Sequence, residues 1–283
     1  MKYQPPFGAA DPEAPYVDKN VPGAIAGSKV PAKAIEHPQR ELDHLIEHAG
    51  LTPGEADLEQ VRKAIQYLAR AAAFGPKTLV KFTTPGASSW AVPAGVTSIL
   101  VRVWGAGGGG GYAVTYNTSA PSGGASGGFA EQGFTVAPGE VVSINVGAGG
   151  IGGQVSPVQQ DGQPGLASSV TVGGVTIAGG GGSGGLNTTT AGVTANSPAG
   201  GSFTGASGIR GSDGSLGVAI DTNTTAFGGA GGAAPLGGGH AVGGSGHPGP
   251  GRVPGGGGGA TSDINFAGAS GARGEVHIIY SVN

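Results

Sequence analysis

Apolar residues recur at every second position, or in short continuous runs, in much of the chain after residue 85. Six such segments are bounded by glycine, proline and asparagine, as β-strands are: residues 96–104, 128–136, 141–146, 168–172, 175–178 and 274–282. Pro93 to Gly95 and Ala137 to Gly139 predict turns, and Gly173 and Gly174 between two valines predict a hairpin. The pattern predicts a mainly β fold, an antiparallel β-sandwich or jelly-roll-like framework, whose first and last strands pair.

Between residues 38 and 73 the apolar positions have helical spacing instead. Residues 38–49 predict a short helix with Pro38 in its first turn and Gly50 as its left-handed C-terminal cap. Thr52 and Glu55 are spaced as a capping box that starts a second helix. In that helix, five apolar residues are spaced three and four apart, as in the seam of a coiled coil: Leu58, Val61, Ile65, Leu68 and Ala72.

Two interpretations of this stripe are open. It joins copies of the chain in a coiled coil, or it packs on the chain's own helix at residues 38–49. A helix this short is marginal alone, so both interpretations require tertiary or intersubunit contacts.

The first 37 residues have no sustained apolar periodicity and hold six prolines: Pro5, Pro6, Pro12, Pro15, Pro22 and Pro31. Proline restricts its own φ and favours extended backbone before it, so these residues predict an extended arm. Such an arm builds no core of its own, and it is either disordered or laid against a partner.

Glycine is concentrated in the β region. Only six of the 63 glycines precede Pro85, so 57 follow it. The tracts at residues 228–239 and 243–259 have no strand propensity and no strict collagen repeat. Glycine lets backbones approach closely, and buried N–H and C=O groups must be paired, so we expect packed polyproline-II helices here. Flexible loops are the alternative.

Charge follows the same division. Ten of the 14 Lys and Arg residues precede Phe82, and the formal net charge is −3. No basic stripe typical of nucleic-acid binding is visible, so we expect no nucleic-acid partner. Cysteine is absent, which excludes disulfides. No apolar run is long enough for membrane insertion, and residues 1–11 do not resemble a signal peptide. A protein that acts outside the cell would then need another route out, and release by lysis as part of an assembled particle is one such route.

Little in the sequence indicates chemistry. The letters of residues 105–110 fit a dinucleotide-binding pattern. That pattern also requires a helix after the last glycine and an acidic residue at the end of a second strand, and the sequence predicts neither. His240, His247 and Asp263 have metal-ligand chemistry but lie in glycine tracts, where solvated histidines are expected instead. No paired carboxylates or activated nucleophile stand out. We expect neither catalysis, nor a cofactor, nor a bound metal.

Recognition is easier to support, because binding sites gather on loops carried by rigid frameworks. Aromatic and polar side chains flanked by glycine are candidates for stacking on sugars or contacting protein loops: Tyr112, Tyr116, Asn117, Phe203, Arg210 and Phe227. The alternative is that the phenylalanines are small core anchors and the tyrosines are merely interfacial.

Two parts of the sequence resemble proteins of tailed bacteriophages. PQREL at 38–42, LI at 45–46, AGLTP at 49–53, DL at 57–58 and AIQ at 64–66 resemble the attachment region of tail-fibre and baseplate proteins. WAVPAGVT at 90–97, followed by residues 101–111, looks like the opening of the glycine-rich domain of phage tail fibres. GFTVAPGE at 133–140 and VGAGG at 146–150 match the next hairpin of that domain.

The resemblance implies a virion protein, made in the host cytoplasm and acting outside the cell. Residues 1–50 would attach to the baseplate or another tail protein, and residues 51–81 would form a trimerisation helix and linker. Residues 82–283 would bind a saccharide or an outer-membrane protein of the bacterial surface. Proteins of this group are typically trimers, which favours the coiled-coil interpretation.

Two alternatives differ in class. The glycine-rich domain could be a purely structural tail component without receptor binding. A polyproline-II ice-binding or other glycine-rich structural protein is more remote, because a regular comb of threonine or alanine is missing and the attachment-like N-terminus would have no purpose.

Overall fold

The computed structural model describes residues 3–19, 27–74, 77–114, 118–154, 161–188, 194–220, 226–239 and 241–281, without the side chains of residues 70–74. The chain forms two compact units, Met1–Gly75 and Pro76–Asn283. Within the described residues, neither helix has the length and apolar character needed to cross a membrane. Each unit is described separately below.

The first unit contains α1 (Ala32–His48) and α2 (Gln60–Phe74). Helix α1 begins directly after Pro31, whose φ and ψ of −63° and 145° are extended. The prediction that Pro38 lies in the first turn is therefore wrong, because Pro38 lies inside the helix. The good helix formers Ala32 and Ala34 extend the helix back to Pro31.

The predicted C-terminal cap of α1 is confirmed. Gly50 has a φ of 76°, in the left-handed region. The N–H of Leu51 donates to the carbonyl of Ile46 at 3.1 Å, and that of Gly50 to Glu47 at 2.8 Å. This pair of hydrogen bonds is a Schellman motif.

The predicted capping box at Thr52 and Glu55 is wrong, because α2 begins only at Gln60. The side chain of Gln60 folds back over the preceding turn, where its Oε1 accepts the N–H of Gly54 at 2.9 Å. Its Nε2 donates to the carbonyl of Asp57 at 2.6 Å. These side-chain hydrogen bonds stabilise a turn in place of the first helical turn.

The two helices pack on each other, and Ala64 of α2 is fully buried, while Ile46 of α1 is nearly so. The buried face of α2 is therefore centred on Ala64 rather than on the predicted seam. Leu58 precedes the helix and is 97% exposed, and Ile65 also remains exposed. Packing within the chain accounts for part of the stripe, and no coiled coil is confirmed.

The second unit is mainly β, with two five-stranded sheets and one two-stranded ribbon among the described residues, all antiparallel. The first sheet has the order β1-β12-β3-β4-β9 and the second β2-β5-β6-β7-β8; β10 pairs with β11. The strands are β1 (Thr78–Phe82), β2 (Gly86–Ala91), β3 (Ser98–Trp104), β4 (Phe129–Thr135), β5 (Val141–Val146), β6 (Ser168–Val172), β7 (Val175–Gly179), β8 (Phe203–Thr204), β9 (Ser207–Ile209), β10 (Val218–Ala219), β11 (Ala226–Phe227) and β12 (Glu275–Tyr280).

All six predicted strands are present, as β3, β4, β5, β6, β7 and β12. The predicted pairing of the first of them with the last is confirmed, since β3 pairs with β12 and Val101 lies opposite Ile278. The hairpin between β6 and β7 is confirmed too, with positive φ at Gly173 and Gly174. A jelly roll is not confirmed. Buried side chains of both sheets, such as Val103 and Val142, share one hydrophobic cluster.

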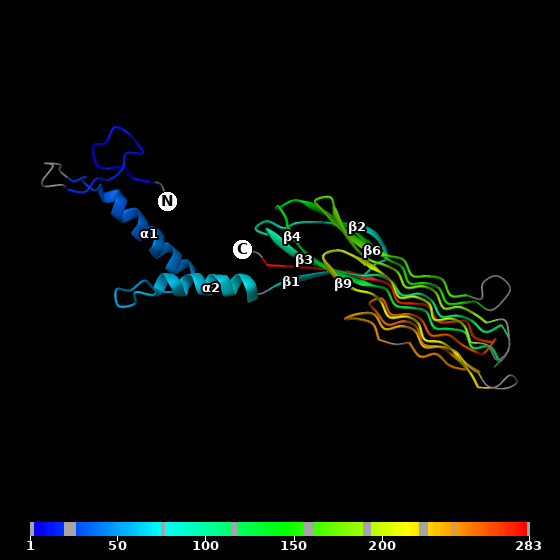
Figure 1. The fold of residues 1–283 in the computed structure, drawn as a ribbon. Helices are drawn as coiled ribbons and strands as arrows, with labels where there is room; N and C mark the ends of the chain where they lie inside the picture. The colour runs from blue at the N-terminus through cyan, green and yellow to red at the C-terminus, as the bar shows by residue number, and fades with distance from the viewer. Residues whose placement is uncertain are drawn as a thin grey trace. The chain divides into compact units, whose positions relative to one another are not determined.

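Outside the sheets, glycine-rich tracts run side by side away from the strands (Figure 1). All seven backbone N–H groups of residues 105–111 donate to other tracts, at 2.8–3.0 Å, and the recipient changes with each residue in a cycle of three. Gly105, Gly108 and Gly111 donate to Gly128, Ala125 and Ser122; Ala106 and Gly109 donate to Leu166 and Gln163; Gly107 and Gly110 donate to Ala272 and Ala269. A period of three without internal hydrogen bonds is that of a polyproline-II helix.

A second tract, residues 122–128, is surrounded in the same way. Its N–H groups donate in turn to residues 180–186, 212–215 and 255–258. The tracts predicted from composition share the pattern, since Gly229 and Gly232 donate to Pro121 and Gly124. These bonds favour packed polyproline-II helices over flexible loops.

The close packing explains why these positions are glycine. A Cβ added to Gly107 would lie 2.1 Å from the carbonyl oxygen of Gly256, and one added to Gly108 equally close to that of Ser183. Both contacts are with backbone, which cannot rotate away. By contrast, a Cβ added to Gly133 in β4 would meet nothing within 4 Å.

A cluster around Trp104 joins the first sheet to the tracts. The indole Nε1 donates to the carbonyl of Pro235 at 2.7 Å, and the ring contacts those of Phe129 and His277 at centroid distances of 4.9 and 4.7 Å. Beside it, Glu275 accepts from Arg273 at 2.7 Å and lies 2.9 Å from His277 Nε2. Burial raises the pKa of Glu275, but the hydrogen bonds from Arg273 and His277 together with the charges of these two residues outweigh burial and hold the pKa below its ordinary value.

We predict that Gly107→Ala destabilises the second unit by about 1–3 kcal/mol, because the new methyl group collides with the Gly256 backbone. Calorimetric unfolding should show a fall in melting temperature of about 2–4 °C per kcal/mol. The matched control is Gly133→Ala, which has free space. Equal melting temperatures for the two variants would contradict the packed arrangement.

We also predict that Glu275→Gln lowers stability at neutral pH. Because the folded-state pKa of Glu275 is lowered, its contribution is present above the unfolded-state pKa of about 4.3 and is lost as pH falls through the folded-state value. The difference between variant and wild type in denaturant unfolding should therefore shrink below about pH 4. Glu47→Gln, at an exposed position of α1, is the control, and a difference that persists at low pH would count against the ionic explanation.

Candidate functional site

At their end opposite the sheets (Figure 1), the tracts lead into segments that contain larger residues, such as Tyr112, Phe227 and Phe266. We call this region the tip, and define it as residues 112–114, 216–220, 226–227, 242–247 and 261–266. Several backbone contacts hold these segments together, including bridges of Thr261 to Tyr112 and to Gly244. The tip is therefore built by five segments drawn from residues 112 to 266.

Residues 261–266 form its most hydrogen-bonded part. The hydroxyl of Thr261 donates to the carbonyl of Gly246 at 2.8 Å, and that of Ser262 to the carbonyl of Ala226 at 2.6 Å. One carboxylate oxygen of Asp263 accepts both the N–H and the Nδ2 of Asn265, at 2.9 and 2.8 Å. Side chains here are used to fix the backbone of the loop.

Tyr112, a predicted receptor contact, is an anchor of this loop. Its side chain is only 5% exposed, and its hydroxyl donates to the carbonyl of Ile264 at 2.7 Å. Burial, followed by the nearby charge of Asp263, raises the pKa of Tyr112. A receptor would reach little of this side chain, although its role in binding stays a prediction.

His247 and Phe266 stack at the tip, with ring centroids 4.0 Å apart and planes inclined at 49°. His247 is exposed and Phe266 half-buried. Across the part of the chain that the structure describes, no three His, Asp or Glu side chains gather as a metal site would require. His240, considered together with His247 and Asp263, lies outside that part.

Exposed apolar side chains form a row along β10 and its flanks. Leu216, Val218 and Ile220 are spaced two residues apart, and Val218 lies opposite Phe227 of β11. All four are between 42% and 65% exposed. We call these four residues the tip stripe. An apolar row left in water at the end of a rigid frame is typical of an interaction surface.

The other predicted receptor contacts are not brought to the tip. Phe203 lies in β8 at the edge of the second sheet, and Arg210 follows β9 and forms an ion pair with Asp213 at 2.8 Å. Tyr116 and Asn117 lie outside the described residues. Of the six candidates, the structure thus places only Tyr112 and Phe227 in the tip.

Sequence reasoning missed three residues of the tip stripe, Leu216, Val218 and Ile220. Their alternation with Gly217 and Ala219 is a strand signal that could have found them.

The first unit carries the predicted trimer contacts. Leu58 and Ile65 are exposed, Val61 and Leu68 are half-buried, and the side chain of Ala72 lies outside the described part. Their role in trimer formation stays a prediction.

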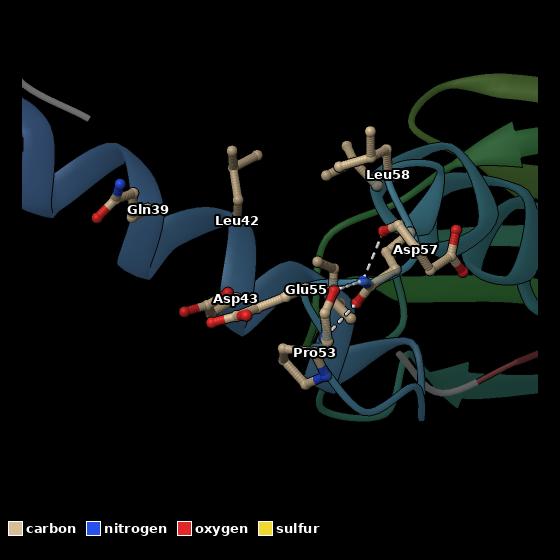
Figure 2. A pocket seen from close by; sticks show the side chains of 11 residues that line it. Gln39, Leu42, Asp43, Pro53, Glu55, Asp57 and Leu58 are labelled. Carbon is tan, nitrogen blue, oxygen red and sulfur yellow. Dashed lines mark hydrogen bonds between the residues drawn. The ribbon is translucent and has the colours of Figure 1, made fainter.

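A groove of about 440 Å³ lies between α1 and the turn before α2. Figure 2 shows Leu42 of α1 and Leu58 of the turn projecting in the same direction, towards the top of the view, with Asp43 and Glu55 below them. Ile46, Pro53 and Val61 also line it. Unlike the charge-poor tip, this groove combines apolar walls with carboxylates.

Comparison with known proteins gives one family. Residues 83–281 match the model of a family described as a glycine-rich domain. Since the match covers most of the chain, the protein belongs to this glycine-rich domain family. No curated protein matches the chain significantly.

Proposed function

We propose that the chain is a tail-fibre or tail-tip protein of a tailed bacteriophage. In this proposal the first unit attaches the protein to the baseplate or another tail protein, the chain acts as a homotrimer, and the second unit binds the bacterial surface without catalysis. The N-terminal sequence resemblance supports the attachment role, and membership of the glycine-rich domain family is consistent with the binding role.

The observation that carries the proposal is the tip stripe on a hydrogen-bonded frame. The tracts behind it are held by bonds in three directions, so the stripe is presented with little loss of conformational freedom on binding. The stripe carries no charge, which suits weak contacts that gain strength through several copies on one particle.

A receptor at the bacterial surface would be a saccharide or an outer-membrane protein. Phe227 supplies an aromatic face for stacking, and the aliphatic members of the stripe supply area for contact with protein. These side chains differ from the surface residues near the sheets, where Arg102 and Glu131 form an ion pair.

The test is binding of the fluorescently labelled full chain to a panel of bacterial strains, including strains with truncated lipopolysaccharide. We expect saturable binding to some strains only, and a loss on truncation would indicate a saccharide receptor. The double variant Ile220→Ser/Phe227→Ser should bind about tenfold more weakly, since it removes apolar contact area without disturbing the fold.

Val141→Ser is the matched control, because Val141 is as exposed as Ile220 but lies in β5. Equal binding by the double variant and the control would exclude the tip stripe as the receptor surface. Absence of binding to every strain, including one on which the particle grows, would favour a purely structural tail component.

A further inference from the structure

The groove of the first unit has features of a peptide-binding site. Its volume of about 440 Å³ lies in the range of about 300–1,000 Å³ found for ligand clefts. One wall is helix α1 and the other is the turn and first residues of α2. Binding of an amphipathic helix in an apolar groove is a recurring mode of recognition.

The apolar residues of the groove are only partly covered. Leu58 is 97% exposed and Leu42 44% exposed, while Ile46, which also lines the groove, is buried. A leucine with almost its whole side chain in water contributes nothing to the fold of its own unit. Leu58 would contribute favourable free energy only on binding, when an apolar side chain of a partner covers it.

The charges at the groove specify the partner further. Asp43 and Glu55 are exposed, line the groove, and form no ion pair with any residue that the structure describes. Asp57, the third carboxylate there, is already bound to Lys63 at 2.6 Å, which helps to hold the pKa of Asp57 below its ordinary value. Two carboxylates are therefore available for cations of a partner.

We infer that this groove binds an amphipathic helix of another protein of the particle, which has leucine-like side chains on one face and lysine or arginine beside that face. The apolar side chains would cover Leu42 and Leu58, and the basic ones would pair with Asp43 and Glu55. The inference rests on the attachment role proposed for the first unit and names the chemistry of its partner. It assigns Leu58 to that partner in place of the trimer contact predicted from the sequence.

The surface also continues beyond the groove. Leu42 also belongs to an open face of α1 to which Leu45 and His48 contribute. A partner helix longer than the groove would therefore find further apolar contact along α1.

The test uses two synthetic peptides and the full chain. One peptide is an amphipathic helix of leucine and lysine, and the other has glutamate in place of each lysine. In calorimetric titration, the wild-type chain should bind the lysine peptide about tenfold more tightly than the glutamate peptide. The variant Asp43→Lys/Glu55→Lys should reverse this preference, because both charges at the groove are inverted.

Removal of the apolar wall gives a second measurement. Leu58→Gln should weaken binding of the lysine peptide about tenfold. The controls are Ile35→Gln and Glu47→Lys, both at exposed positions of α1 that do not line the groove, and both should bind as the wild type does. Circular dichroism should show the same helix content for all variants.

Three results would overturn the inference. They are no binding of the lysine peptide, binding that neither set of groove variants changes, and self-association of the chain that Leu58→Gln abolishes, since a second copy would then be the occupant. Cell binding reports on the second unit, so its failure with normal peptide binding would remove the adhesin role and leave the groove assignment intact.

Discussion

Every third residue of a glycine-rich tract points its N–H group at the same neighbour, and this cycle is the constraint on which the second unit depends. A tract with three donor directions must be enclosed on all sides, as residues 105–111 and 122–128 are. At the glycine positions, enclosure leaves no room for a Cβ, since one at Gly107 would lie 2.1 Å from a backbone oxygen; only a few positions, such as Ala106 and Ala125, accommodate one. Glycine thus serves close packing here, although it weakens isolated chains by increasing the entropy lost on folding.

A lattice of backbone bonds buries little apolar surface, so its ends must be fixed by something else. The two sheets supply a hydrophobic cluster, and β3, β4, β7 and β12 each lead directly into or out of a tract. Trp104 connects the two parts through its bond to Pro235. The arrangement separates the source of stability, at the sheets, from the tip, where side chains are free to vary without loss of the core.

The strands with strong apolar alternation could be predicted from sequence, and so could the hairpin at Gly173 and the cap at Gly50. The start of α1 could not, because helix propensity before Pro38 outweighed the preference of proline for a first turn. The capping box failed because Gln60 offered the backbone other hydrogen bonds. The tip was predicted only at Tyr112 and Phe227, although the alternation of Leu216, Val218 and Ile220 is a strand signal in the local sequence. Its assembly from several segments depends on long-range contacts, such as that of Thr261 with Tyr112, which local sequence does not contain.

Hydrogen exchange followed by mass spectrometry would test the packed lattice most directly. The account predicts that peptides covering residues 105–111 and 122–128 exchange as slowly as those of β3 and β5, because each N–H group in these tracts is bonded and buried. Complete exchange of both tracts within seconds, beside protected strands, would contradict it and would show that the glycine-rich segments are loops attached to a conventional β domain.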